Sequence, residues 1–162
     1  MALTILAWLV AIPMLGFATG LRSMSGMAVL CWFVYFDALW VGNDWMAWTG
    51  KFWVAVLFTV FALAELVADK MPWIPNRVSP APLIFRLVMG GLAGAISATS
   101  LHGSELEGIL LGAIGALLGA ILGYNVRKHL VESNGWPDWI VALSEDGITL
   151  ICAVMALNII NG

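Results

Sequence analysis

The chain has 162 residues, of which 62% are hydrophobic and only 10% are charged. Because soluble domains carry about 25% charged residues, this composition excludes an ordinary soluble protein and indicates an integral membrane protein. With a net charge of −3 and no basic tract, the chain gives no sign of a nucleic-acid partner, and its expected partner is membrane lipid.

The apolar runs predict an all-α membrane protein, a bundle of about six transmembrane helices in one domain over residues 1–162. A span needs about 20 residues, so the chain has room for five or six spans with little left for a soluble domain. The second run is short, and it is expected either to cross the membrane fully or to form a tilted half-helix. The predicted spans are residues 2–19, 27–41, 52–68, 83–99, 108–126 and 139–160.

The distribution of Lys and Arg predicts the orientation of these spans. Numbered along the chain, the first loop is the short break from Gly20 to Gly26, and the second and fourth loops together hold one base, Lys51. The odd-numbered loops and their borders hold six: Arg22, Lys70, Arg77, Arg86, Arg127 and Lys128. Since cytoplasmic loops carry the excess of Lys and Arg, the odd loops are expected to be cytoplasmic and both termini to lie outside. Tryptophans mark the same boundaries, as in an aromatic belt: Trp40, Trp45, Trp48 and Trp53 outside, and Trp73, Trp136 and Trp139 inside.

A row of glycines runs along the fifth predicted helix. Small residues spaced four apart let helix backbones approach closely, which is a main way in which helices associate in lipid. We expect this row to serve tight packing within the bundle, and the alternative is a self-association face that would form a homodimer. The glycines are Gly108, Gly112, Gly115, Gly119 and Gly123.

Several acidic residues lie in the inner half of the predicted membrane region, where a carboxylate is costly unless it is paired, protonated or hydrated. Glu145 is seven residues beyond Asp138, which places it about 10 Å deep. Glu145 and Asp146 point about 100° apart on a helix, so one can pair with an arginine while the other faces a cavity. The candidate ion- or substrate-binding residues are Glu65, Asp69, Glu145, Asp146, Arg22 and Arg86. Two further residues, Arg77 and Arg127, are candidate contacts for anionic lipid headgroups.

This charged cluster leaves three functions open. The favoured one is a small transporter or channel whose carboxylates bind a cation or a proton, because ionisable groups inside a membrane are functional by default. The second is a structural or assembly protein in which the charges form a closed salt-bridge network. The third, given less weight, is lipid-headgroup binding or an intramembrane enzyme. No catalytic residue and no cofactor is predicted, since the sequence holds neither a His/Cys zinc cluster nor a nucleophile elbow.

A short internal similarity suggests two related halves. Ala62-Leu63-Ala64-Glu65 resembles Ala142-Leu143-Ser144-Glu145 at an offset of 80 residues. Two halves of three helices would have opposite orientations, the arrangement that many transporters use to form a binding site between inverted repeats. The sequence therefore allows an inverted-repeat bundle.

A set of motifs spread over nearly the whole chain is specific in combination. The motifs are Gly20-Leu21-Arg22-Ser23-Met24, Glu65 to Pro72 with Pro75-Asn76-Arg77, Gly123-Tyr124 with Arg127, Gly135-Trp136-Pro137-Asp138, and Val141-Ala142-Leu143 with Glu145-Asp146. In this combination the chain resembles the bacterial membrane-protein family called domain of unknown function 4126. The resemblance implies a multi-pass protein of the bacterial inner (plasma) membrane whose charged positions belong to the family pattern. It implies no activity, because the family has none assigned.

Overall fold

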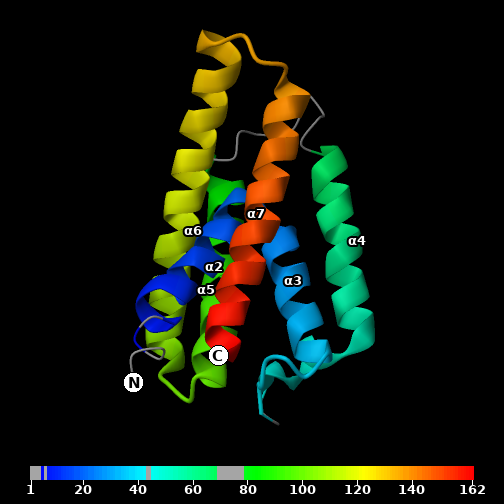
Figure 1. Cartoon of the computed structure of the whole chain (residues 1–162), viewed down its shortest axis with the longest axis vertical. Helices are drawn as coiled ribbons and strands as arrows, with labels where there is room; N and C mark the ends of the chain where they lie inside the picture. Colours follow the sequence, from blue (N-terminus) through cyan, green and yellow to red (C-terminus); the bar gives the residue numbers. More distant parts are fainter. Residues whose placement is uncertain (1–4, 6, 43–44, 69–78) are drawn as a thin grey trace.

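The computed structural model describes residue 5 and residues 7–42, 45–68 and 79–162. All regular structure among these residues is helical, as the sequence predicts, and successive α-helices alternate in direction (Figure 1). The α-helices are α2 (Ile12–Leu21), α3 (Ser23–Tyr35), α4 (Phe52–Ala68), α5 (Pro80–Ser100), α6 (Glu105–Lys128) and α7 (Asp138–Asn161). Shorter turns are η1 (Ala7–Ala11) and η3 (His129–Ser133), both π-helical, and the 3₁₀ helix η2 (Trp45–Gly50).

The helices fall into two length classes. Three segments are long and apolar enough to cross a membrane: Pro80–Ser100, Glu105–Ser133 and Asp138–Asn161. Helix α4 coincides with the predicted run over residues 52–68 but has only 17 residues. Segments Ala7–Leu21 and Ser23–Tyr35 are shorter still, about 22 and 20 Å long against a hydrocarbon core of about 30 Å. Three of the six predicted spans therefore have the length of a full crossing.

Helices α2 and α3 form a hairpin whose tip lies inside the bundle instead of at its end (Figure 1). Leu21, the last residue of α2, lies against Gly123, five residues before α6 ends, which is about 7 Å of helix. The predicted break over residues 20–26 is wrong in extent, because the helices are separated by Arg22 alone. The break is this short because other helices supply the partners that its backbone groups need, as described below.

Helix α3 also ends before the predicted second span does. Asp37 adopts the left-handed conformation with φ of 55°. The N–H of Ala38 donates to the carbonyl of Phe33 at 2.9 Å, and the N–H of Asp37 donates to the carbonyl of Val34 at 3.1 Å. This pair of bonds is a Schellman motif, which terminates a helix whatever the hydropathy of the residues that follow.

Helix α2 is the centre of the bundle and packs against α3, α5, α6 and α7. Close approach is possible because glycines face one another: a Cβ on Gly16 would overlap the backbone of Gly112, and one on Gly112 would overlap that of Gly90. The five glycines of the predicted row in α6 are all buried, and they lie against α2 or α5. This face therefore packs within one chain and is not exposed for self-association.

Exposed tryptophans lie at both ends of the bundle. Trp45 and Trp53 are at the end formed by η2 and the start of α4, and Trp136 and Trp139 are at the opposite end, beside the start of α7 (Figure 1). Trp73 lies outside the described residues. Exposed tryptophans at two ends are typical of the two interfaces of a membrane.

Two of the six bases used to predict the orientation do not lie at an interface. Arg22 and Arg86 are only 1% and 5% exposed, whereas the positive-inside bias concerns loops and helix ends. Setting them aside reduces the asymmetry from six bases against one to four against one. Lys70 and Arg77, two of those four, lie outside the described residues.

Because α6 makes close backbone contacts, replacing Gly112 in α6 and Gly147 in α7 by alanine should change the free energy of unfolding by very different amounts. Gly112→Ala inserts a Cβ between α6 and α5 and should lower the free energy of unfolding by about 1–3 kcal/mol or more. Gly147→Ala, in a stretch of α7 where a Cβ meets nothing within 4 Å, should be neutral or stabilise by up to about 1 kcal/mol. Thermal melts of both variants in one detergent measure the difference. Equal melting temperatures would show that α6 does not pack in this way.

Candidate functional site

The candidate site surrounds the break between α2 and α3. Arg22 is extended there, with φ −141° and ψ 101°, so the carbonyl end of α2 and the N–H end of α3 lie next to each other within the bundle. Terminal backbone groups have no partner within their own helix and are costly to bury without one. The end of α2 carries a partial negative charge and the start of α3 a partial positive charge.

Arg86 caps the end of α2 from α5. Its Nη1 donates to the carbonyl oxygens of Gly20 and Leu21, at 2.6 and 2.7 Å. The arginine lies six residues into α5, about 9 Å along the helix. A guanidinium is well suited to this position, since its positive charge matches the negative end of the helix and its hydrogen bonds are charge-assisted.

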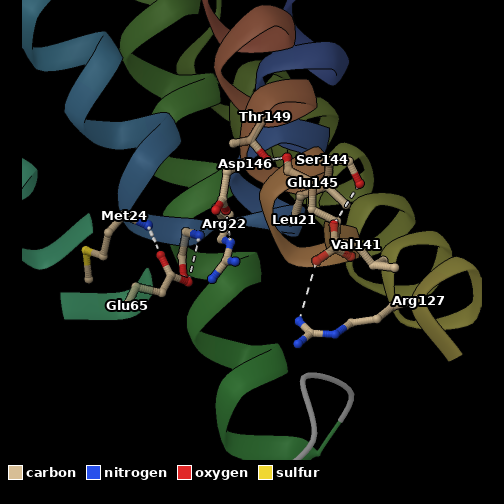
Figure 2. Close-up of polar contacts among 12 residues, drawn as sticks. Leu21, Arg22, Met24, Glu65, Arg127, Val141, Ser144, Glu145, Asp146 and Thr149 are labelled. Atoms are coloured by element: carbon tan, nitrogen blue, oxygen red, sulfur yellow. Dashed lines mark hydrogen bonds and ion pairs between the residues drawn. The ribbon is translucent and has the colours of Figure 1, made fainter. Parts of the chain in front are cut away.

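Glu65 caps the start of α3 from α4 (Figure 2). Its Oε1 accepts hydrogen bonds from the backbone N–H of Ser23 at 3.2 Å and from the hydroxyl of Ser23 at 2.9 Å. Its Oε2 accepts from the N–H of Met24 at 3.0 Å. The same carboxylate lies 3.5 Å from Nη2 of Arg86. The two caps therefore neutralise each other as well as the two helix ends.

Arg22, at the break itself, connects the site to α7 through an ion pair with Asp146. Its Nε lies 2.6 Å from Oδ1 of Asp146, with the two side chains 1% and 15% exposed. Figure 2 shows the two groups facing each other between the hairpin tip and α7. Removing one partner of a buried ion pair leaves the other uncompensated, which costs about 3–5 kcal/mol. This pair therefore fixes the tip of the hairpin to the last helix.

Glu145 points away from Asp146, toward α6 (Figure 2). Its Oε2 lies 3.6 Å from Nη1 of Arg127. Its Oε1 lies beside Gly123 of α6, and a Cβ placed on that glycine would be 3.6 Å from this oxygen. Arg127 also donates two hydrogen bonds to Asp138, at 2.9 and 2.8 Å. The side chain of Asp138 is 51% exposed, whereas that of Glu145 is 7% exposed. Arg127 therefore joins a carboxylate at the end of the bundle to one in its interior.

The structure brings five of the six predicted ion- or substrate-binding residues around the break: Arg22, Glu65, Arg86, Glu145 and Asp146. Asp69 lies outside the described residues, as does Arg77. Arg127 faces the carboxylates of Asp138 and Glu145, and its contact with lipid headgroups stays a prediction. No group of three or more His, Cys, Asp or Glu side chains in the described part of the chain is arranged to hold a metal ion.

Sequence reasoning missed two parts of the site. The first is the set of backbone groups at the break, the carbonyls of Gly20 and Leu21 and the N–H groups of Ser23 and Met24, which carry no sequence signal of their own. The second is the pairing of Asp138 with Arg127. A signal for it existed, because a base at the end of one helix and an acid at the start of the next are brought together by a short connection.

The two kinds of ion pair should differ in stability when one partner loses its charge. Glu65→Gln removes a countercharge from the buried Arg86 and should lower the free energy of unfolding by about 3 kcal/mol. Asp138→Asn weakens a half-exposed pair and should cost less than about 1 kcal/mol. Both variants keep side-chain shape and replace one accepting oxygen by an NH2 group, so thermal melts compare the same chemical change at the two positions. A loss for Asp138→Asn as large as that for Glu65→Gln would contradict the assignment of Glu65 to the interior.

Comparison with known proteins places the chain in a family without defining an activity. No curated protein and no solved structure is detectably similar to it. A family model matches residues 9–159, a range that includes every residue of the site described above. The chain therefore belongs to the family described as Domain of unknown function (DUF4126).

Proposed function

We propose that this protein is a small membrane transporter or channel whose buried carboxylates bind a cation or a proton. The observation that carries the proposal is the charge of the cluster. Its carboxylates are the buried Glu145 and the partly buried Glu65 and Asp146, and its buried guanidiniums are Arg22 and Arg86. Arg127 is shared between Glu145 and Asp138 and adds no net charge to this group. Among the residues that the structure describes, the carboxylates therefore outnumber the guanidiniums by one, and a single proton or monovalent cation would neutralise that charge.

The backbone around the cluster supports the same proposal. Transporters form their ion sites at discontinuous helices, where carbonyls at the end of one half-helix and N–H groups at the start of the next face a cavity. The α2–α3 break presents both kinds of group, and charged side chains from α4, α5 and α7 converge on it. Placing ionisable residues inside a membrane costs free energy, and proteins typically keep them there at functional sites.

The two adjacent acids of α7 suggest a route for the ion. Asp146 faces Arg22 at the hairpin tip, and Glu145 faces Arg127 toward the end of the bundle. Beyond Arg127 lies the half-exposed Asp138. Asp146, Glu145 and Asp138 thus lie one after another from the break to the end of the bundle. This order is expected if a cation or proton enters the site from the cytoplasm.

A second candidate function is a structural or assembly protein. It is favoured by the ion pairs themselves, since Glu65, Glu145 and Asp146 each lie within 3.6 Å of a guanidinium nitrogen. A network closed in this way would hold the α2–α3 hairpin and helices α4, α5, α6 and α7 together without moving any ion. The two functions differ in what happens when one buried carboxylate loses its charge.

Glu145→Gln separates these two functions. Under the transport proposal the variant should fold, because a hydrogen-bonding group of the same shape remains and the excess negative charge is removed. It should lose proton- or cation-dependent flux in proteoliposomes, measured with an internal pH-sensitive dye under sodium, potassium and choline gradients. It should also lose any pH- or cation-dependent rise in melting temperature, which follows ligand linkage. Glu132→Gln, at an exposed residue of η3, is the control and should behave as wild type.

The opposite pattern would favour the structural function. Wild-type protein that carries no flux and melts at the same temperature in every ion and at every pH from about 5 to 8 would contradict transport. A collapse of Glu145→Gln, by about 3–5 kcal/mol, would then identify the cluster as a closed network.

The proposal includes an orientation in the bacterial inner membrane: both termini outside, with the end of the bundle that holds η3 in the cytoplasm. Single cysteines at Glu132 and Lys51, in a background lacking Cys31 and Cys152, test it. Both positions are exposed and they lie at opposite ends. A membrane-impermeant maleimide added to intact spheroplasts should label Lys51→Cys and spare Glu132→Cys. The reverse labelling would overturn the orientation.

A further inference from the structure

Three oxygen atoms around the guanidinium of Arg86 form what we call the cradle: the carbonyl oxygens of Gly20 and Leu21 and Oε1 of Glu65. Two belong to the carbonyl end of α2, where the helix dipole concentrates negative charge. The third carries a formal negative charge and is held in place by Ser23 and Met24. Carbonyl and carboxylate oxygens at the end of a half-helix are the ligands by which transporters hold small cations.

We propose that the cradle is a cation-binding site and that Arg86 is its built-in occupant, which a small monovalent cation replaces when Arg86 withdraws. The inference rests on the proposed transport function and names the site at which its cation binds. Arg86 and the cation exclude each other, because both are positive and both need the same oxygens. A tethered guanidinium also keeps the two carbonyls and the carboxylate satisfied whenever the cation is absent.

The charge and composition of the cradle select the class of ligand. One carboxylate provides one formal negative charge, which a monovalent cation neutralises and a divalent cation would exceed. Two neutral carbonyls complete a set of hard oxygen ligands, which suits sodium, potassium or a planar hydrogen-bond donor such as guanidinium. Choline matches their charge but carries it on a bulky trimethylammonium group that has no N–H donor, so it should be excluded.

Removing the built-in occupant provides the test. Arg86→Met keeps a long flexible side chain and empties the cradle of positive charge. In choline chloride the variant should melt well below wild type. Adding guanidinium, sodium or potassium at millimolar concentration should raise its melting temperature saturably, by about 5–10 °C at a hundred times the dissociation constant. Wild-type protein should respond to the same additions much more weakly than Arg86→Met, because a cation can enter the cradle only when Arg86 has withdrawn from it.

Two further variants control for a general charge effect. Arg127→Met removes the same charge from a residue that faces the carboxylates of Asp138 and Glu145 and is no part of the cradle, and it should give no such saturable response. The double variant Arg86→Met/Glu65→Gln removes the carboxylate of the cradle and should lose the response that Arg86→Met gains. An equal response in Arg127→Met, or an undiminished response in the double variant, would overturn the inference.

Each remaining outcome for Arg86→Met either supports the cradle as a cation site or excludes it. If Arg86→Met folds and no cation raises its melting temperature more than choline does, the cradle is not a cation site. If it can be purified only with guanidinium, sodium or potassium present and not with choline, the inference is supported. If it fails in all four salts, the inference is overturned. Transport is judged separately from wild-type flux, so flux with no cation response in Arg86→Met leaves the proposed function standing and removes this site.

Discussion

Two helix ends meet inside the bundle at the α2–α3 break, and the arrangement of the site follows from the need to satisfy them. In a hydrocarbon environment a carbonyl or N–H group without a partner costs several kcal/mol. Arg86 and Glu65 supply charges of the sign that each helix end favours. Because these residues come from α5 and α4, the bonds that satisfy the break also fix two further helices around it.

Helix α2 of the hairpin can lie this close to α6 because the residues that face each other are small. Gly16 and Gly20 of α2 face Gly112 and Ala116 of α6, so the backbones approach as closely as small residues allow. The same device continues at Gly123, where the missing side chain leaves room beside the carboxylate of Glu145. The same face of α6 therefore packs against α2 and borders the carboxylate of Glu145. A substitution that adds a larger side chain on this face would disturb both the helix contact and the charged site.

The sequence predicted those parts of the structure that depend on local pattern. Hydropathy and length were enough for the helical class and for the bounds of α4, and helical rise was enough to bring Glu145 to the depth of the hairpin tip. The break was misplaced because hydropathy cannot distinguish a loop in water from an extended residue whose backbone groups are capped by distant side chains. Arg22 and Arg86 were consequently counted as interfacial charges. The carbonyls of Gly20 and Leu21 were missed since every residue has a carbonyl, and only the fold shows which ones lack a helical partner.

The length of the hairpin has a consequence for biogenesis. Segments Ala7–Leu21 and Ser23–Tyr35 are translated before α4, α5 and α7, yet these later helices hold the groups that satisfy their junction. Neither segment is long enough to cross a bilayer by itself, and Arg22 at the tip would meet lipid without its countercharge. The long helices α5, α6 and α7 can each be inserted on hydropathy alone. The hairpin is therefore translated before these helices but reaches its final place after them, and a chain truncated before Asp146 would lack the carboxylate that faces Arg22 at its tip.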